Sequence, residues 1–116
     1  MNVTFTLNGV VLEPDERAYI VRKLESVAAI ASNVQRADVE IKEDKRNDYF
    51  VEAVIITDKN EYRATEVAVT VTAAIDIMED ELKSQIRDDK KRRETIARRG
   101  GRSIKKKLTL SQDSRL

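Results

Sequence analysis

The residues best suited to chemistry in this sequence are lysines and arginines that recur at helical spacing between residues 83 and 93. At about 100° per residue, Lys83, Arg87, Lys90 and Lys91 fall within about 80° of one another on a helix. Cations one turn apart, at about 5.4 Å, can follow the phosphates of a nucleic-acid backbone. The dipole of a helix end explains a few of these cations but not the whole group. The predicted polyanion-binding set in this helix is Lys83, Arg87, Lys90, Lys91, Arg92 and Arg93.

Three cations outside this helix are weaker candidates for the same surface. Lys23 lies in the first predicted helix, Lys42 in the second predicted strand and Arg63 in the fourth. Each has acidic neighbours, so a solubilising role explains them as well as phosphate binding does. The aromatic residues are scattered over core-like segments and do not form the paired stacking platform of single-strand binders. Contacts to nucleic acid should therefore be made mainly to phosphates and to the shape of structured RNA.

Charge is divided sharply along the chain. Residues 1–86 contain 10 lysines and arginines against 17 acids, a net charge of −7. Residues 87–116 contain 12 against 4, a net charge of +8, so the whole-chain value of +1 hides a strong asymmetry. An acidic body with a basic extension predicts a polyanionic partner, and nucleic acid is the commonest polyanion in a cell.

The sequence lacks the residues that most catalytic and metal-binding sites require. There is no histidine, no cysteine and only 3 glycines, so the usual general base, thiolate ligands and a glycine-rich phosphate loop are missing. Carboxylate pairs such as Asp76 and Asp80 are expected by chance among 21 acids. We therefore expect no enzyme, cofactor, metal site or small-molecule substrate. No apolar run approaches the roughly 20 residues that cross a bilayer, and a signal peptide is not apparent, so we expect a cytoplasmic protein without a membrane partner.

The elements that must position these cations follow from hydrophobic periodicity. Residues 3–7 alternate strictly between apolar and polar, which predicts a half-buried strand closed by the turn residues Asn8-Gly9. Pro14 opens a predicted helix over residues 14–31. Further strands are predicted over residues 37–42, 49–57 and 61–65, with residues 49–57 as a central strand. The short loops between these three strands predict an antiparallel meander.

The second predicted helix is the longest element. An apolar stripe at helical spacing runs from Val71 to Ile86, and helix-forming residues continue until Gly100-Gly101, which we expect to break the helix. The resulting order, β-α-β-β-β-α, predicts an α+β two-layer sandwich in which two helices cover one face of a four-stranded sheet. We expect one domain over residues 1–95 and a basic, disordered tail over residues 96–116.

This pattern resembles the ribosome hibernation-promoting factors, also called ribosome-associated inhibitor or sigma-54 modulation proteins. The resemblance covers about residues 2–95. It depends on the element order, on the first strand ending in Asn-Gly and on the second helix. There, Thr-Ala-Ala-Ile-Asp over residues 72–76 leads into Asp-Glu-Leu-Lys-Ser-Gln-Ile-Arg over residues 80–87. The chain departs from the family pattern at Glu81, Ser84 and Asp88-Asp89, where the family usually carries cations or an uninterrupted basic run.

The resemblance implies a fold like the double-stranded-RNA-binding domain and docking on the small ribosomal subunit. There the family occupies the channel for mRNA and tRNA, and cations on the helices and the sheet rim contact ribosomal RNA. Arg63 sits where the family often has a basic or polar residue. The cations that match the family pattern are Lys23, Lys42, Lys83, Arg87, Lys90 and Lys91.

The sequence thus predicts a monomeric, non-enzymatic factor that silences translation during stress or stationary phase. Two alternatives remain open at this point. One is a general RNA- or DNA-binding module that uses the same basic helix. The other is a regulator whose acidic body contacts a basic protein partner.

Overall fold

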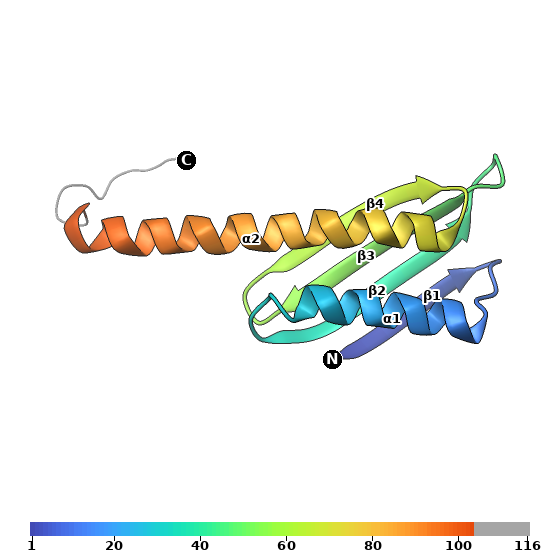
Figure 1. Ribbon diagram of the computed structural model, residues 1–116, viewed down its shortest axis with the longest axis horizontal. Coiled ribbons are helices and arrows are strands. Elements are labelled where there is room, and N and C mark those ends of the chain that lie inside the picture. The colour runs from blue at the N-terminus through green and yellow to red at the C-terminus, as the bar shows by residue number, and fades with distance from the viewer. Residues whose placement is uncertain (104–116) are drawn as a thin grey trace. The chain divides into compact units, whose positions relative to one another are not determined.

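The computed structural model describes the backbone of residues 1–103 and the side chains of residues 1–97. It has the predicted α+β class and element order, which are confirmed (Figure 1). No helix in this described part is long and apolar enough to cross a membrane. The elements are β1 (Asn2–Asn8), α1 (Pro14–Ala28), β2 (Val34–Glu43), β3 (Tyr49–Thr57), β4 (Glu61–Ala68) and α2 (Val71–Ser103).

The four strands form one mixed sheet in the order β1-β2-β3-β4. The antiparallel meander β2-β3-β4 and the interior position of β3 are confirmed. β1 pairs with β2 in parallel, with Phe5 opposite Val39. The two strands can be parallel because α1 lies between them in the chain. This helix carries the chain back to the end of the sheet at which β1 began. β4 is therefore left as one of the two sheet edges.

The core lies between the sheet and the two helices. Alternate strand residues point into it, such as Val39, Val51 and Ile55, each at most 1% exposed. The helices contribute buried residues at helical spacing, including Ile20 of α1 and Leu82 of α2. Because all of these belong to one hydrophobic cluster, α1 and the first part of α2 cover the same sheet face, as Figure 1 shows.

α1 is shorter than expected at its carboxyl end. It begins at Pro14 as predicted, and the Glu16 side chain accepts a hydrogen bond from the Glu13 N–H (2.9 Å). It ends at Ala28 rather than at residue 31. The N–H of Ile30 donates to Val27 and that of Ala31 to Ala28, a tightened turn that starts the return to β2.

Thr70 sets the start of α2. Its hydroxyl accepts a hydrogen bond from the Ala73 N–H (3.1 Å), which is the standard N-cap arrangement. β4, which precedes this cap, extends to Ala68 and so beyond its predicted end at residue 65. The prediction that Gly100-Gly101 breaks the helix is wrong, because α2 continues through Ser103. Glycine costs a helix about 1 kcal/mol relative to alanine, which is a penalty and not a steric block. The expected tail is therefore helical over residues 96–103, and residues 104–116 lie outside the described part.

The chain divides into two compact units, Met1–Ile86 and Arg87–Leu116, and α2 begins in the first and continues in the second. This division falls at the same place as the change in charge. We call residues 1–86 the acidic unit, with a net charge of −7, and residues 87–116 the basic unit, with a net charge of +8.

Candidate nucleic-acid interface

Two of the predicted cations in the acidic unit meet at one carboxylate. Glu79 of α2 binds Lys23 of α1 (Nζ to Oε1, 3.2 Å) and Lys83 of α2 (Nζ to Oε2, 3.3 Å). The Ser26 hydroxyl donates a third hydrogen bond to Glu79 (2.8 Å). The Glu79 side chain is only 14% exposed, and those of Lys23 and Lys83 are 29% and 23% exposed. Lys23 therefore joins α1 to α2, whereas Lys83 pairs with Glu79 within α2.

Asp76 extends this interhelical network along α2. It lies 3.6 Å from the Lys23 ammonium and accepts a hydrogen bond from the Tyr19 hydroxyl. Hydrogen bonding to Asp76, together with desolvation, raises the pKa of Tyr19. Hydrogen bonding to Glu79 raises the pKa of Lys23, so this lysine is charged throughout the physiological range. Desolvation opposes ionisation of Glu79, but hydrogen bonds from Ser26, Lys23 and Lys83 outweigh it and lower the Glu79 pKa.

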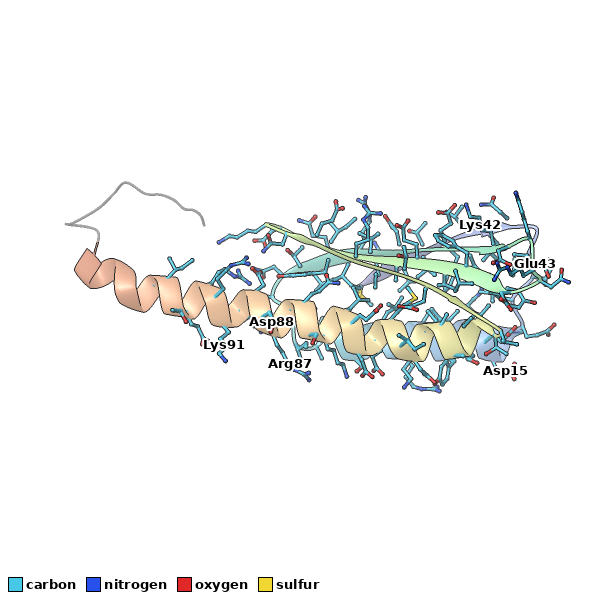
Figure 2. All side chains as sticks on the ribbon, turned by 90° about the horizontal axis from the view of Figure 1, so that it is seen from above. Asp15, Lys42, Glu43, Arg87, Asp88 and Lys91 are labelled. Atoms are coloured by element: carbon cyan, nitrogen blue, oxygen red, sulfur yellow. The ribbon has the colours of Figure 1, made fainter. Side chains whose placement is uncertain are left out.

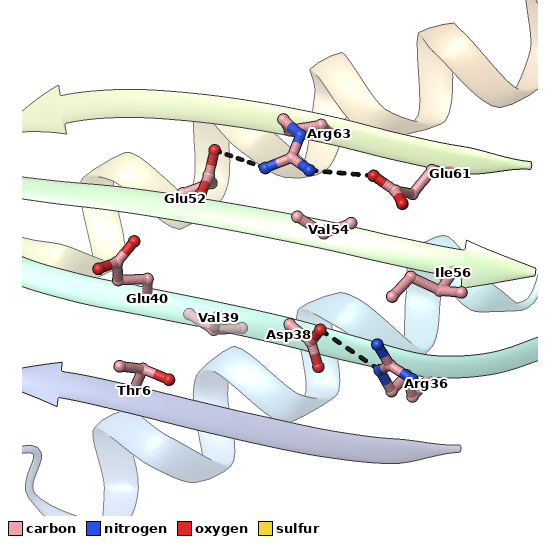
Figure 3. A pocket seen from close by; sticks show the side chains of 10 residues that line it. All are labelled: Thr6, Arg36, Asp38, Val39, Glu40, Glu52, Val54, Ile56, Glu61 and Arg63. Atoms are coloured by element: carbon pink, nitrogen blue, oxygen red, sulfur yellow. Dashed lines mark hydrogen bonds and ion pairs between the residues drawn. The ribbon is translucent and has the colours of Figure 1, made fainter.

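Two other predicted cations lie on the opposite face of the sheet. Arg63 of β4 is clamped between Glu52 and Glu61, with both nitrogen–oxygen distances 2.9 Å (Figure 3). Hydrogen bonds to these two acids raise the pKa of Arg63. Lys42 of β2 lies over the Phe50 ring, 4.9 Å from its centre. This open face also carries an Arg36–Asp38 pair around a hollow of about 480 Å³.

The basic unit presents cations of a different kind. Arg87 and Lys91 are both exposed, and Lys90 is half-buried. Neither Arg87 nor Lys91 forms an ion pair with any residue whose side chain is described. The two are separated by one helical turn, and Figure 2 shows them leaving the same edge of α2. They are therefore free to attract an external anion.

Arg92 and Arg93 share a single acid within the basic unit. The Asp89 carboxylate binds Arg92 (2.5 Å) and Arg93 (3.1 Å) through its two oxygens. One negative charge against two guanidinium groups leaves this cluster positive. It orients the two arginines without removing their attraction for phosphate.

The predicted cations thus fall into three groups. Lys23 and Lys83 come together through Glu79 on the helical side of the acidic unit, whereas Lys42 and Arg63 lie on its open sheet face. The other five lie in the basic unit. Sequence reasoning missed Glu79 as a partner of Lys23, since 56 residues separate them. Its pairing with Lys83 could have been found, because Glu and Lys at i and i+4 attract one another on a helix.

Among the described residues there is no group of three or more acids, histidines or cysteines placed to hold a metal ion. What the cations can do is bind anions. The basic unit offers the only described pair from the predicted set, Arg87 and Lys91, that is both exposed and without an ion-pair or aromatic partner.

Two solved structures have a fold similar to that of this chain. A ribosomal subunit interface protein from Coxiella burnetii superposes with a TM-score of 0.67 at 16% identity, covering 78% of this chain and 98% of that one. The Protein Y N-terminal domain from Thermus thermophilus gives 0.65 at 20% identity, covering 74% and 96%. At this identity the likeness establishes the fold. A search among curated proteins gave no significant match.

A comparison with protein-family models identifies the relationship directly. Residues 3–94 match the model described as sigma 54 modulation protein / S30EA ribosomal protein. The match covers nearly all of β1, the whole of α1, β2, β3 and β4, the part of α2 up to residue 94, and the cations from Lys23 to Arg93. The chain therefore belongs to the sigma 54 modulation protein / S30EA ribosomal protein family.

Proposed function

We propose that this protein binds the small ribosomal subunit through ribosomal RNA, occupies the channel used by mRNA and tRNA, and so silences translation without chemistry. The observation that carries the proposal is the exposed pair Arg87 and Lys91 on a helix of the basic unit, in a chain of the S30EA ribosomal protein family. The neighbour from Coxiella burnetii, which is described as a ribosomal subunit interface protein, supports the same assignment.

The charges suggest how binding is confined to one region. Phosphates are attracted to the basic unit, with its net charge of +8, and repelled by the acidic unit, with −7. Lys23 and Lys83 add little net attraction because two carboxylates, Glu79 and Asp76, already lie against them. We therefore rank Arg87, Lys90 and Lys91 as the principal phosphate contacts, followed by the arginines around Asp89. Lys42 and Arg63 rank last, since Lys42 lies over Phe50 and Arg63 is held by two glutamates.

Sedimentation with purified small subunits tests the proposal. The parent protein should co-sediment at low salt, and the Arg87→Glu/Lys91→Glu variant should remain at the top of the gradient. The control is Lys45→Glu/Arg46→Glu, which changes the same residue types by the same charge on the exposed β2–β3 loop. This control should still bind. Equal loss in both variants would mean that net charge, and not the Arg87–Lys91 surface, determines binding.

Salt and competition separate this function from the two alternatives. Binding should weaken steeply with salt, and the double variant should have a log–log slope shallower by about 1.4 to 1.8, since each of the two lost phosphate contacts contributes about 0.7 to 0.9. tRNA bound in the channel should compete with the protein. Equal affinity for free duplex RNA or DNA would favour a general nucleic-acid module. A flat salt response would favour a regulator that binds a protein partner.

A further inference from the structure

The outer edge of β4 is open over two residues. At Arg63 this edge is closed by a side chain, because the Arg63 N–H donates to Gln85 Oε1 (3.3 Å) and Gln85 Nε2 donates to the Arg63 carbonyl (2.8 Å). Backbone groups alternate in direction along an antiparallel strand, so Thr65 and Val67 face the same way as Arg63. Their N–H and carbonyl groups on this edge have no partner among the described residues. Gln85 thus makes the hydrogen bonds that a further strand would make to Arg63. The outward-facing backbone groups of Thr65 and Val67 are left open.

A hollow lies beside this open edge. It has a volume of about 570 Å³ and is lined from β4 by Thr65 and from α2 by Glu81 and Ser84, among others. The strand and the helix that line it also carry exposed apolar side chains. Val67 is 51% exposed, and Ile77, one helical turn before Glu81, is 46% exposed. The edge therefore combines unpaired backbone groups with apolar surface, which is the composition of a strand-addition site.

The charges beside the edge are acidic and uncompensated. Glu66 points from β4 toward α2, where it meets Glu81, and neither carboxylate forms an ion pair with a described residue. Burial, hydrogen bonding to Glu66 and repulsion by its charge raise the pKa of Glu81. The nearest cation of β4, Arg63, is already held by Glu52 and Glu61. No cation among the described residues is therefore paired with Glu66 or Glu81.

We propose that the β4 edge binds an extended protein segment in which a lysine or arginine is flanked by β-branched residues, by strand addition along Thr65–Val67. In such a pairing the residue opposite Glu66 has its Cβ about 5 Å from that of Glu66, on the side that faces α2. Its cation reaches the space between Glu66 and Glu81. The flanking residues point to the open sheet face, beside Thr65 and Val67.

Charge argues against two other occupants of this edge. A second copy of the chain paired through β4 would bring the Glu66 and Glu81 carboxylates of both copies together, and like charges across a strand pair are destabilising. Nucleic acid would place phosphates against the same acids. A basic extended peptide relieves the repulsion that both of these would increase.

The test uses the ¹⁵N-labelled full chain and a blocked nonapeptide in which lysine alternates with valine and threonine. Titration should shift the amide resonances of Thr65 and Val67 and of the α2 residues 77–85. Replacing each lysine in the peptide by glutamate should weaken binding at least tenfold, as should methylating the peptide nitrogens that face β4. No shift up to millimolar peptide, or equal binding of the glutamate peptide, would overturn the proposal.

Variants of the protein supply the matched controls. Thr65→Pro should abolish binding yet preserve the β3 pairing, because the lost N–H faces the open edge. Glu66→Gln/Glu81→Gln should weaken binding at least tenfold without relying on a backbone change. Glu25→Gln/Glu43→Gln, with the same change of charge at exposed sites, should have no effect. A dimer seen by sedimentation equilibrium and lost in Thr65→Pro would assign the edge to a second copy and overturn the proposal.

Discussion

The two units use their charged residues in opposite ways. In the acidic unit, Lys23, Arg63 and Lys83 are all held by nearby carboxylates, and the Glu79 network ties α1 to α2 around a hydrophobic core. In the basic unit, Arg87 and Lys91 are exposed and unpaired among the described side chains. The number of cations in a region therefore does not say how many of them are left available to an external anion. What matters is how many cations remain without an internal acid.

The largest difference between the units should be in the stability that is lost when an isoleucine is replaced by alanine. Ile75 is 1% exposed in the core of the acidic unit, whereas Ile96 in the basic unit is 59% exposed. Ile75→Ala should lower the free energy of unfolding by about 3 kcal/mol, because it removes a buried side chain and leaves a cavity. Ile96→Ala should change it by less than about 0.5 kcal/mol. Urea unfolding followed by circular dichroism measures both, and similar losses would contradict a core confined to the acidic unit.

A smaller effect should come from Glu79, where the acidic unit neutralises its cations. Glu79→Gln should lower the free energy of unfolding by about 1 to 2 kcal/mol at pH 7, because three charge-assisted contacts are weakened. The lowered pKa of Glu79 means that its ionisation stabilises the fold above its ordinary value of 4.5 and that this contribution is lost in acid. The difference between parent and variant should therefore shrink below about pH 4.5. If the difference in the free energy of unfolding between parent and variant did not depend on pH, packing and not charge would explain the lost stability.

The smallest effect should be a gain in stability at Glu81. Its pKa is raised, so the folded state binds this proton more tightly than the unfolded chain, and ionisation at neutral pH destabilises the fold. Glu81→Gln should raise the free energy of unfolding by about 0.5 kcal/mol at pH 7, the usual size of a like-charge penalty. In acid, where the parent is protonated, the gain should vanish. Thermal unfolding at pH 7 and pH 4 measures it, and a destabilised variant at pH 7 would show that the carboxylate has a partner.

Much of the fold could be predicted because it is encoded locally. The period of a strand is visible in the alternation over residues 3–7 and 37–42. The period of a helix is visible in the apolar stripe from Val71 to Ile86. In the structure the apolar residues of these segments face the core. The end of α2 could not be predicted from Gly100-Gly101. Glycine is a modest local penalty, and the structure continues the helix through it. The end of α1 was missed for a related reason, since residues 29–31 are apolar and helix-compatible but turn toward β2.

The candidate site could be predicted less completely, because a cation's availability depends on contacts distant in sequence. Helical spacing identified the basic positions but not their partners. Lys23 meets Glu79 across two helices, and Arg63 meets Glu52 only through the β3–β4 register. The residue-by-residue roles in RNA binding remain predictions. The structure adds a ranking, in which Arg87 and Lys91 precede the cations that acids already hold.

The parallel pairing of β1 with β2 has a consequence for how the protein folds. β2, β3 and β4 are joined by short turns, so their contacts close small loops, whereas β1 joins the sheet only after the chain has traversed α1. Loop closure costs more entropy for such a crossover, and non-local pairing slows folding. The meander should therefore assemble early, with β1 added late. In the native state β1 should be the first strand to detach, which would expose the edge of β2 for a short time.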